Sequence, residues 1–386
     1  MIQFYDGNRI ELLRSGAEYF PALAAACDAA ISEIHLQTYI FANDHSGRYV
    51  AEALMRAARR GVAVHLLIDG FGSKELSAKF LRGLQEAGVQ VLKYRPQIAV
   101  WRFRRTQLRR LHHKIAVVDA HVAFIGGINV IDDMDTPGQV PPRFDYAVKV
   151  EGALLARIHS IATRLWNLAA WTQLRLHKLP RPVASVPAER RGEQRAAFVV
   201  RDNLRHRNDI ENTYLAAIKH ARSEILIANA YFFPGIDFRH ALIGAAARGV
   251  RVILLLQGRV EYRLLHYASR ALYRQFLDAG IEIYEYRRSF MHAKVAVIDN
   301  HWATVGSSNI DPMSLLLARE ANVVIEDTGF AHELRRSLEQ AMMTGAEPVR
   351  HMEWQGLQTR LLPRLCYEIV RFLIGWSSYG RARDFT

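Results

Sequence analysis

Short apolar runs alternate with amphipathic segments along this chain, and the order in the first half returns in the second. Runs of strand length lie at 10–13, 31–41, 62–69, 89–94 and 144–151, then at 198–200, 223–233, 250–256, 281–286 and 320–326. Segments with apolar residues at helical spacing lie at 46–60, 73–88, 154–172, 209–221, 237–248 and 262–280. Strands alternating with helices predict an α/β fold, here two tandem α/β/α sandwich domains related by internal duplication.

The segments between and after the repeats mark the expected domain boundaries. Residues 179–197 are rich in Pro and Arg and have no apolar period, which predicts a linker between a first domain, 1–178, and a second, 198–350. The tail, 351–386, has no counterpart in the first half. From Pro363 it predicts an amphipathic helix, which either lies in a membrane interface or packs on the second domain. Its apolar face comprises Leu365, Ile369, Phe372, Leu373 and Trp376, and its polar face Arg360, Arg364, Glu368 and Arg371.

One motif occurs twice at a constant offset of 180 residues. The first copy consists of His112, Lys114, Asp119, Gly126 and Asn129, and the second of His292, Lys294, Asp299, Gly306 and Asn309. Two copies in one chain support the duplication and predict a single site at the interface between the halves.

Strand geometry indicates what each copy can build. Residues i and i+2 share a face, so His112 and Lys114 point the same way, whereas Asp119, seven residues from His112, points elsewhere. A tight turn after Asp119 brings Gly126 opposite Lys114, and a glycine there leaves space beside the lysine. We therefore expect Asp119 and Asp299 to anchor the hairpin ends and support the site indirectly. The groups expected to surround the substrate are Gly126, Asn129, Gly306 and Asn309.

These residue types suit the chemistry of a phosphodiester. Lys114 and Lys294 can neutralise charge on the non-bridging oxygens, and the asparagines can donate hydrogen bonds to them. One imidazole can attack phosphorus while the other protonates the leaving oxygen, and the residues alone leave open which does which. Each imidazole needs an acceptor on its other nitrogen, for which Asp145 and Glu320 are the candidates. No metal or other cofactor is expected, because two lysines repel a cation.

Composition limits the partners. The net charge of +13 favours a polyanionic partner, either nucleic acid or an anionic membrane. Basic and aromatic residues alternate in 100–111, including Trp101 and Phe103, which favours contact with anionic headgroups over a solvated face. We expect no signal peptide and no membrane-spanning segment. The acidic run Asp132, Asp133 and Asp135 is similar to a metal loop but lacks a further ligand.

The doubled motif resembles the signature of the phospholipase D superfamily, His-x-Lys-x4-Asp-x6-Gly-[Gly/Ser]-x-Asn, and the resemblance spans about residues 9–345. Within the superfamily the chain is most similar to bacterial cardiolipin synthases of the shorter type, which lack transmembrane helices. The segments that carry this similarity are 109–114, 124–129, 145–148, 306–312 and 320–323.

The resemblance implies a phosphatidyltransferase that joins two phosphatidyl units on one glycerol. The donor is phosphatidylglycerol or phosphatidylethanolamine, and the acceptor is a glycerol hydroxyl of phosphatidylglycerol. His112 is then the nucleophile that forms a covalent phosphohistidine, and His292 the general acid and base. The motif residues counted as catalytic are His112, Lys114, Asp119, His292, Lys294 and Asp299.

Two other functions compete with this one. A phospholipase D-type hydrolase or nuclease would use the same covalent step and suit the positive charge, and an inactive membrane-binding protein would need no complete motif. The tail helix and the Trp101–Phe103 pair favour lipid. We therefore expect phospholipid substrates and an anionic phospholipid membrane as partners, with nucleic acid disfavoured. The expected location is peripheral, on the cytoplasmic side of a bacterial cell membrane.

Overall fold

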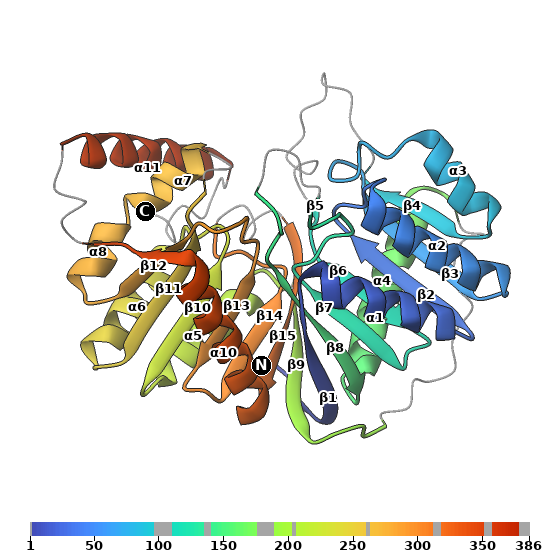
Figure 1. Cartoon of the computed structure of the whole chain (residues 1–386), viewed down its shortest axis with the longest axis horizontal. Helices are drawn as coiled ribbons and strands as arrows, with labels where there is room; N and C mark the ends of the chain where they lie inside the picture. The colour runs from blue at the N-terminus through green and yellow to red at the C-terminus, as the bar shows by residue number, and fades with distance from the viewer. Residues whose placement is uncertain are drawn as a thin grey trace.

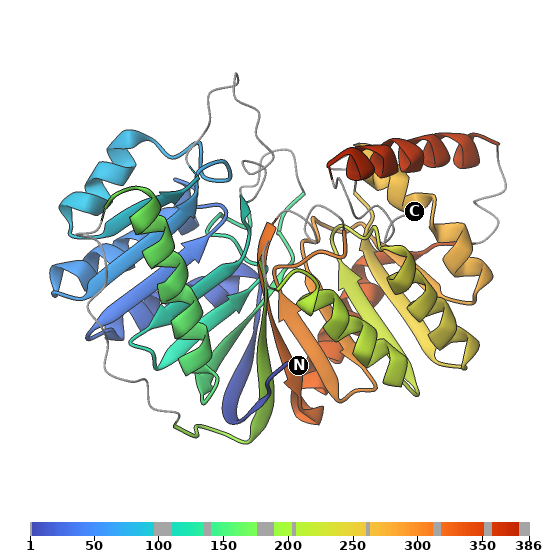
Figure 2. The ribbon, with the colours of Figure 1, turned by 180° about the vertical axis from the view of Figure 1, so that it is seen from behind.

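The fold is built around one continuous sheet of 16 strands with helices on both sides (Figures 1 and 2). The computed structural model describes residues 2–95, 110–134, 140–175, 189–202, 206–259, 263–311, 318–350 and 357–377. The segment with Trp101 and Phe103, residue Asp135 and most of the expected linker lie outside these ranges.

The described part of the first half contains eight strands and four helices. Its strands are β1 (Tyr5–Arg14), β2 (Glu33–Thr38), β3 (Ala63–Asp69), β4 (Gln90–Tyr94), β5 (Arg110–Leu111), β6 (Lys114–Val118), β7 (Val122–Gly126) and β8 (Tyr146–Gly152). Its helices are α1 (Ser15–Ala29), α2 (His45–Arg59), α3 (Ala78–Glu86) and α4 (Leu155–Thr172).

The second half repeats this succession and adds a short strand and a terminal helix. Its strands are β9 (Gln194–Arg201), β10 (Glu224–Asn229), β11 (Arg251–Gln257), β12 (Glu282–Tyr286), β13 (Lys294–Ile298), β14 (Trp302–Gly306), β15 (Ala318–Glu326) and β16 (Ala346–Pro348). Its helices are α5 (Asp209–His220), α6 (Ile236–Ala247), α7 (Arg263–Arg270), α8 (Tyr273–Asp278), α10 (Thr328–Gly345) and α11 (Leu357–Ser377).

Strand order confirms the duplication. The first half reads β1-β8-β7-β6-β2-β3-β4 and the second reads β9-β15-β14-β13-β10-β11-β12, with β16 added at the second edge. The halves join where β1 pairs antiparallel with β9. The α/β prediction is confirmed, and the two sandwiches share a sheet because each half places its first strand at the joint.

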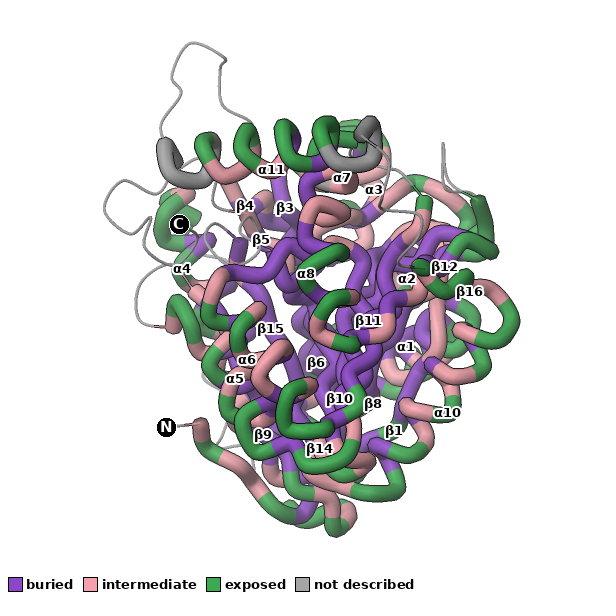
Figure 3. Tube along the Cα trace, turned by 90° about the vertical axis from the view of Figure 1, so that its left-hand side faces the viewer, coloured by how far each residue is buried: buried purple, intermediate pink, exposed green. Residues whose placement is uncertain are grey.

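Three large apolar cores hold the layers together. One lies beneath α1 and α2, a second beneath α5, α6 and α8, and the third contains residues of both halves together with α4 and α10. In the third core β7 and β8 lie against β14 and β15, so the halves are packed on each other as well as hydrogen-bonded. Figure 3 shows the strands mostly buried and the exposed residues concentrated on the surrounding helices. Burial of apolar area in the shared core therefore fixes the relative position of the two motif copies.

Several predicted boundaries are wrong by a few residues. Helix α3 begins at Ala78, with the Ser77 hydroxyl accepting a hydrogen bond from the Phe80 N–H, and not at residue 73. Ser73 is buried instead, and its hydroxyl bonds to the backbone of the turn after β2. The expected helix at 262–280 is two shorter helices, α7 and α8. Strand β9 starts at Gln194, inside the expected linker, because its first residues pair with β1 and β15.

Candidate active site

Both motif copies form the hairpins that strand parity predicts. In the first, β6 pairs antiparallel with β7 and Lys114 lies opposite Gly126. In the second, β13 pairs with β14 in the same register, so that Val295 lies opposite Val305 and Lys294 precedes this pair. The histidine of each motif lies just before the hairpin, where the chain runs beside a segment of the other half.

Each motif histidine is hydrogen-bonded to a carboxylate of the opposite half. His112 Nδ1 lies 2.8 Å from Glu320 Oε1 and 3.0 Å from Oε2. His292 Nδ1 lies 2.7 Å from Asp145 Oδ2. Glu320 and Asp145 are both buried, so these bonds are shielded from water. The two pairs cross the joint between the halves and define one site.

Backbone pairing across the joint brings each histidine to the carboxylate of the other half. Strand β5 pairs in parallel with the start of β15, and the His112 N–H donates to the Arg319 carbonyl at 3.0 Å. On the other side Phe144 forms a parallel bridge with Met291, and the His292 N–H donates to the Phe144 carbonyl at 2.7 Å. Each histidine therefore lies beside the strand that carries the other half's carboxylate.

The two motif lysines are buried within the same site. Lys114 Nζ donates to the His112 carbonyl at 2.6 Å, and Lys294 Nζ donates to the His292 carbonyl. Burial, together with the charge of Lys294, lowers the pKa of Lys114 to about 7, although Glu320 opposes the shift. The Tyr39 ring lies 5.7 Å from the Lys114 ammonium and also contacts the His112 ring edge-on. An anionic diester entering here would meet two poorly solvated cations.

Burial and positive neighbours lower the pKa of both imidazoles. The pKa of His292 is lowered well below its usual value by burial, then by Lys294 and Arg143. The pKa of His112 is lowered by burial, an effect that Glu320 partly offsets. Because an ionised carboxylate only accepts hydrogen bonds, Nδ1 of each ring carries a proton, and in the neutral ring Nε2 carries the lone pair. A lone pair at Nε2 is what a nucleophile or a general base requires.

The two carboxylates are not equivalent. Burial raises the pKa of Asp145 to about 6 despite the charge of Lys294. Burial also acts on Glu320, but His112 and Lys114 outweigh it and the pKa of Glu320 is lowered. The pKa values of the two carboxylates are therefore shifted in opposite directions, that of Asp145 upward and that of Glu320 downward.

Ser307 accounts for part of the difference in pKa between Glu320 and Asp145. The Ser307 hydroxyl donates to Glu320 Oε2 at 2.5 Å. The corresponding residue of the first half is Gly127, where a Cβ would lie 2.3 Å from Asp145 Oδ1 and leave no room for a side chain. Both residues occupy the Gly/Ser position of the motif, so the sequence contained a signal for this contact.

The motif aspartates lie at the far end of each hairpin. The Asp119 carboxylate accepts from the backbone N–H groups of residues 31–33 and from the Ser32 hydroxyl, at 2.7–2.8 Å. The Asp299 carboxylate binds residues 222–224 in the same way. They follow β6 and β13, whereas the lysines begin those strands. These contacts tie each hairpin to the strand beside it, and a catalytic role for Asp119 and Asp299 stays a prediction.

The motif glycines serve strand packing. A Cβ on Gly126 would lie 2.4 Å from the Ala147 Cα and the Tyr146 carbonyl of β8. A Cβ on Gly306 would lie 2.1 Å from Asn322 Oδ1 on β15. The expectation that these glycines leave space for substrate is wrong, because the neighbouring strand fills that space.

The motif asparagines are buried beside the hairpins. Asn129 is 2% exposed and its Oδ1 accepts a hydrogen bond from the Ile40 N–H at 3.2 Å, which fixes the orientation of its amide. Asn309 holds the corresponding position in the second half and is 3% exposed. Asn129 therefore contacts the backbone next to Tyr39, whose ring lies against the His112 ring.

Sequence reasoning missed two residues of this site. Arg143 is buried, stacks its guanidinium 5.0 Å from the Phe290 ring and lowers the pKa of His292 by its charge. Tyr39, described above, lies between strand β2 and the His112 ring. Tyr39 belongs to a segment that the second half repeats around Tyr231, which was a signal in the sequence, whereas the role of Arg143 is revealed only by its tertiary contacts. In the acidic run, Asp132 and Asp133 bond to backbone N–H groups of Met134 and Gly16.

The fold and the doubled histidine–lysine site define a phospholipase D-like enzyme. The family described as "Cardiolipin synthase, PLD-like domain" matches residues 23–134 and 214–342, and the chain belongs to this family. It is 39% identical to Cardiolipin synthase B of Escherichia coli over 386 residues, which cover 96% of this chain and 90% of that protein. It is 29% identical to Cardiolipin synthase 1 of Bacillus cereus over 377 residues, 96% of this chain and 72% of that one.

Solved structures support the fold. The crystal structure of phosphatidylserine synthase from Haemophilus influenzae superposes with a TM-score of 0.71, covering 94% of this chain and 93% of that chain. Its sequence identity is 14%, so this likeness concerns the fold alone.

Proposed function

We propose that this protein makes cardiolipin by transferring a phosphatidyl group from a phosphatidylglycerol donor to the glycerol hydroxyl of a second phosphatidylglycerol. The observation that carries the proposal is the crossed pair of histidines around two buried lysines, His112 with Glu320 and His292 with Asp145. Membership of the cardiolipin synthase family supports the choice of lipid over other phosphodiesters.

The residues of this site can carry out the transfer in two steps. His112 Nε2 attacks phosphorus, the bond from phosphorus to the headgroup oxygen breaks, and that oxygen takes a proton from His292, releasing glycerol. His292 then removes a proton from the acceptor hydroxyl, whose oxygen attacks phosphorus while the phosphorus–nitrogen bond to His112 breaks. Lys114 and Lys294 neutralise the charge on the non-bridging oxygens in both steps.

The unequal carboxylates support this assignment of roles. An ionised Glu320, held by Ser307, stabilises the positive charge that His112 gains on attack. Asp145, with a pKa of about 6, suits a partner of a group that must give and take a proton near neutral pH. The diester charge raises the proton affinity of His292, opposing the lysines that lower it in the free site.

Helix α11 supports membrane association. One face of the helix packs into the core of the second half through Cys366, Tyr367 and Val370. This face is docked on the domain, which was one of the two alternatives expected for the tail. A second face stays exposed although it is apolar, with Phe372 72% exposed. Its described members are Leu361, Leu362, Leu365, Ile369 and Phe372. The helix begins at Leu357, so Pro363 lies inside it and not at its start.

The position of α11 fits a bilayer contact that faces the active site. The helix lies at the same end of the molecule as β5, the strand that leads into His112 (Figure 1). Arg364 and Arg371 lie beside the apolar stripe by helical spacing, where they can pair with anionic headgroups. Among the described residues no helix combines the length and hydropathy needed to cross a membrane. We place the protein peripherally on a bacterial membrane, on its cytoplasmic side.

Product identity tests the proposal. Purified protein is incubated with phosphatidylglycerol vesicles labelled in the acyl chains, and products are separated by mass. We expect cardiolipin, together with an acid-labile phosphatidyl adduct on the enzyme after rapid quenching. His112→Ala and His292→Ala should each abolish cardiolipin formation, and His112→Ala should also lose the adduct. His121→Ala, an exposed histidine that bonds to its own turn, is the matched control.

The lipid products, together with a plasmid-nicking assay, distinguish the competing functions. Phosphatidic acid as the sole product would identify a hydrolase, and nicking of supercoiled plasmid by the wild type but not by His112→Ala would identify a nuclease. Cardiolipin formation at near wild-type rate by either histidine variant would refute the shared site.

A further inference from the structure

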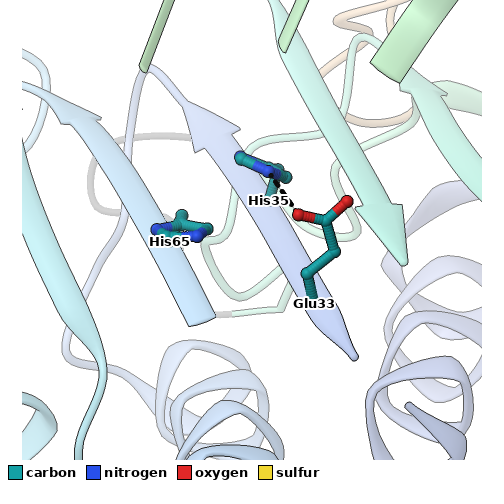
Figure 4. Close-up of side chains that lie close together, drawn as sticks. All are labelled: Glu33, His35 and His65. Carbon is teal, nitrogen blue, oxygen red and sulfur yellow. Dashed lines mark hydrogen bonds and ion pairs between the residues drawn. The ribbon is translucent and has the colours of Figure 1, made fainter. Parts of the chain in front are cut away.

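Three titratable side chains lie buried together in the first half, outside the groups that carry out transfer. Glu33 and His35 lie on β2 and His65 lies on the neighbouring strand β3, all facing the same layer (Figure 4). They are 4%, 0% and 1% exposed. One oxygen or nitrogen from each lies within 4.8 Å of the others. Glu33 Oε2 is 3.3 Å from His35 Nε2, and the two imidazole rings are stacked with centroids 4.6 Å apart.

Helix α4 covers this cluster and contributes to it. His159 Nε2 lies 2.6 Å from Glu33 Oε1, the carboxylate oxygen that does not face His35. The His65 ring packs against the ring of Trp166, also on α4, with centroids 4.7 Å apart. The carboxylate is therefore oriented by a hydrogen bond from a histidine, and carboxylates that bind metals are commonly hydrogen-bonded in this way.

The histidines of the cluster have unsatisfied nitrogens. Neither ring nitrogen of His65 has a hydrogen-bond partner among the described residues, and His35 Nδ1 also has none. A neutral imidazole always carries one N–H donor and one acceptor lone pair. Leaving such groups buried and unpaired lowers the stability of the fold. Without something to bind, these side chains make the fold less stable.

The second half shows that the fold does not need them. Ile34 pairs with Val118 and Ile225 pairs with Ile298, which are 180 residues apart, so β2 and β10 are in equivalent register. The counterparts of Glu33, His35 and His65 are therefore Glu224, Leu226 and Ile253.

Those counterparts form an ordinary core. Leu226 and Ile253 are buried in the shared apolar core. Glu224 pairs with Arg335 of α10 at 2.7 Å, as Glu33 does with His159 of α4. The paired histidines are thus a feature of the first half alone, placed where the duplicated fold accepts leucine and isoleucine.

We propose that Glu33, His35 and His65 bind a divalent transition-metal ion, Zn²⁺, with His159 holding the free carboxylate oxygen. Imidazole and carboxylate are ligands that zinc prefers. Zinc bonds of about 2.0–2.2 Å place ligand atoms roughly 3.5 Å apart. The ligand atoms of this cluster lie within 4.8 Å of one another, so the side chains must move about an ångström closer together to bind the ion. No metal is expected beside the catalytic lysines, and this cluster lies on the far side of Gln37 from them.

The metal would have a structural role next to the active site. Gln37, the next residue of β2 on the same face, donates to the Ala162 carbonyl of α4 at 2.7 Å. Its Oε1 lies 2.8 Å from Nε2 of His113, the neighbour of His112 in the chain. A metal bound between β2 and β3 beneath α4 therefore stabilises strand β2, which Gln37 connects to His113 beside His112. This inference rests on the cluster and not on the proposed function.

Metal content of tag-free, full-length protein tests the inference. After chelation and dialysis the wild type should take up one equivalent of zinc per chain, and its Tm should rise by several degrees. The double variant His35→Leu and His65→Ile installs the residues of the second half and should bind no zinc at that site. Its Tm without metal should equal or exceed that of the metal-free wild type, because the unpaired nitrogens are gone.

Two further variants keep the test decisive. His121→Ala, which removes an exposed histidine of the same half, should retain the full equivalent of zinc. Glu33→Gln should weaken binding at least tenfold while preserving side-chain size, and Co²⁺ bound in place of zinc should lose its tetrahedral absorption bands. Wild-type protein that holds no more zinc than the double variant, or equal loss of zinc in His121→Ala, would overturn the proposal.

Discussion

Each motif histidine is oriented by a carboxylate from the other half of the chain, and the two carboxylates differ in their hydrogen bonds and pKa values. The Glu320 carboxylate receives two hydrogen bonds, from His112 and from the Ser307 hydroxyl. Gly127 stands where Ser307 stands in the other half, so Asp145 lacks the equivalent hydroxyl. A duplicated site with identical motifs thus becomes chemically unequal through one side chain in each half.

Removing the charge on Glu320 should affect the chemical step. Glu320→Gln preserves shape but no longer stabilises the cationic His112, so we expect kcat to fall roughly 10²–10⁴-fold. Ser307→Gly, which copies the first half, should lower kcat about tenfold or more, since a hydrogen bond to a charged group contributes roughly 1.5–3 kcal/mol. Ser337→Ala, which removes a hydroxyl bonded to Tyr146, is the control. A Glu320→Gln enzyme within threefold of wild type would contradict this role.

The pH dependence of kcat/KM should be bell-shaped. The carboxylate of Asp145, with a pKa of about 6, must be ionised, so activity falls as pH drops below that value. The ammonium of Lys114, with a pKa lowered to about 7, must be protonated, so activity falls as pH rises above it. In Lys114→Arg the alkaline limb should move upward, because a guanidinium does not deprotonate. An unchanged alkaline limb in that variant would assign it to another group.

At the scale of elements, the two hairpins are anchored at one end and reactive at the other. The turns after β6 and β13 contain residues with positive φ, among them Asp119 at 50° and Asp299 at 52°. Aspartate tolerates this conformation and its carboxylate satisfies the N–H groups that begin the neighbouring strand. The hairpin therefore holds its histidine and lysine in place through a contact made at its opposite end.

Loss of this anchor should reduce stability more than catalysis. Asp119→Ala leaves three backbone N–H groups and a hydroxyl without their acceptor, and we expect unfolding free energy to fall by roughly 2–4 kcal/mol. Asp299→Ala should behave alike. Thermal melts and initial rates well below the Tm separate the two effects: kcat should stay within a few-fold of wild type. A variant with normal Tm and no activity would return the aspartates to the catalytic group.

Helix α11 should control access to lipid surfaces. Leu365→Glu with Phe372→Glu removes two apolar side chains from the exposed stripe, and vesicle affinity should fall at least about 100-fold, since each such side chain contributes about 1.5–3 kcal/mol when buried. Flotation with vesicles containing phosphatidylglycerol measures this, and Glu368→Ala on the polar face is the matched control. Turnover of a short-chain, monomeric substrate should be unchanged. Normal flotation of the double variant would exclude α11 as the contact.

At the scale of the whole molecule, duplication and exchange make the site indivisible. Strands β1 and β9 join the halves into one sheet, and the shared core packs them together. The active groups then meet only when both halves of one chain are folded against each other. This arrangement couples the correct assembly of the sheet to the formation of either histidine–carboxylate pair.

Mixing inactive variants tests whether one chain forms the complete site. Equal amounts of His112→Ala and His292→Ala protein should show no cardiolipin synthesis, because neither chain holds both histidines. Co-expression should give the same result, and the wild type diluted into either variant should keep its specific activity. Recovery of activity in the mixture would show that halves exchange between chains.

The sequence by itself determined the elements and the reactive groups. Period-two and helical patterns predict the strands and most helices, and the 180-residue offset predicts the doubled hairpins, because both depend on local geometry. The odd number of residues between His112 and Asp119 was enough to predict that their side chains point to different faces of the strand. The helical stripe of α11 was also visible, since helical spacing alone defines it.

Only the tertiary structure decided which groups meet. The exchange of Glu320 and Asp145 between halves depends on β5 reaching β15 and on the bridge between Phe144 and Met291, contacts far apart in sequence. Gly126 packs on β8 rather than facing substrate, a choice set by the neighbouring strand. Glu33, His35 and His65 carry no motif, and they form a cluster because parallel pairing of β2 with β3 brings the histidines together under α4. Local patterns specify elements, whereas these sites arise from the packing of elements on one another.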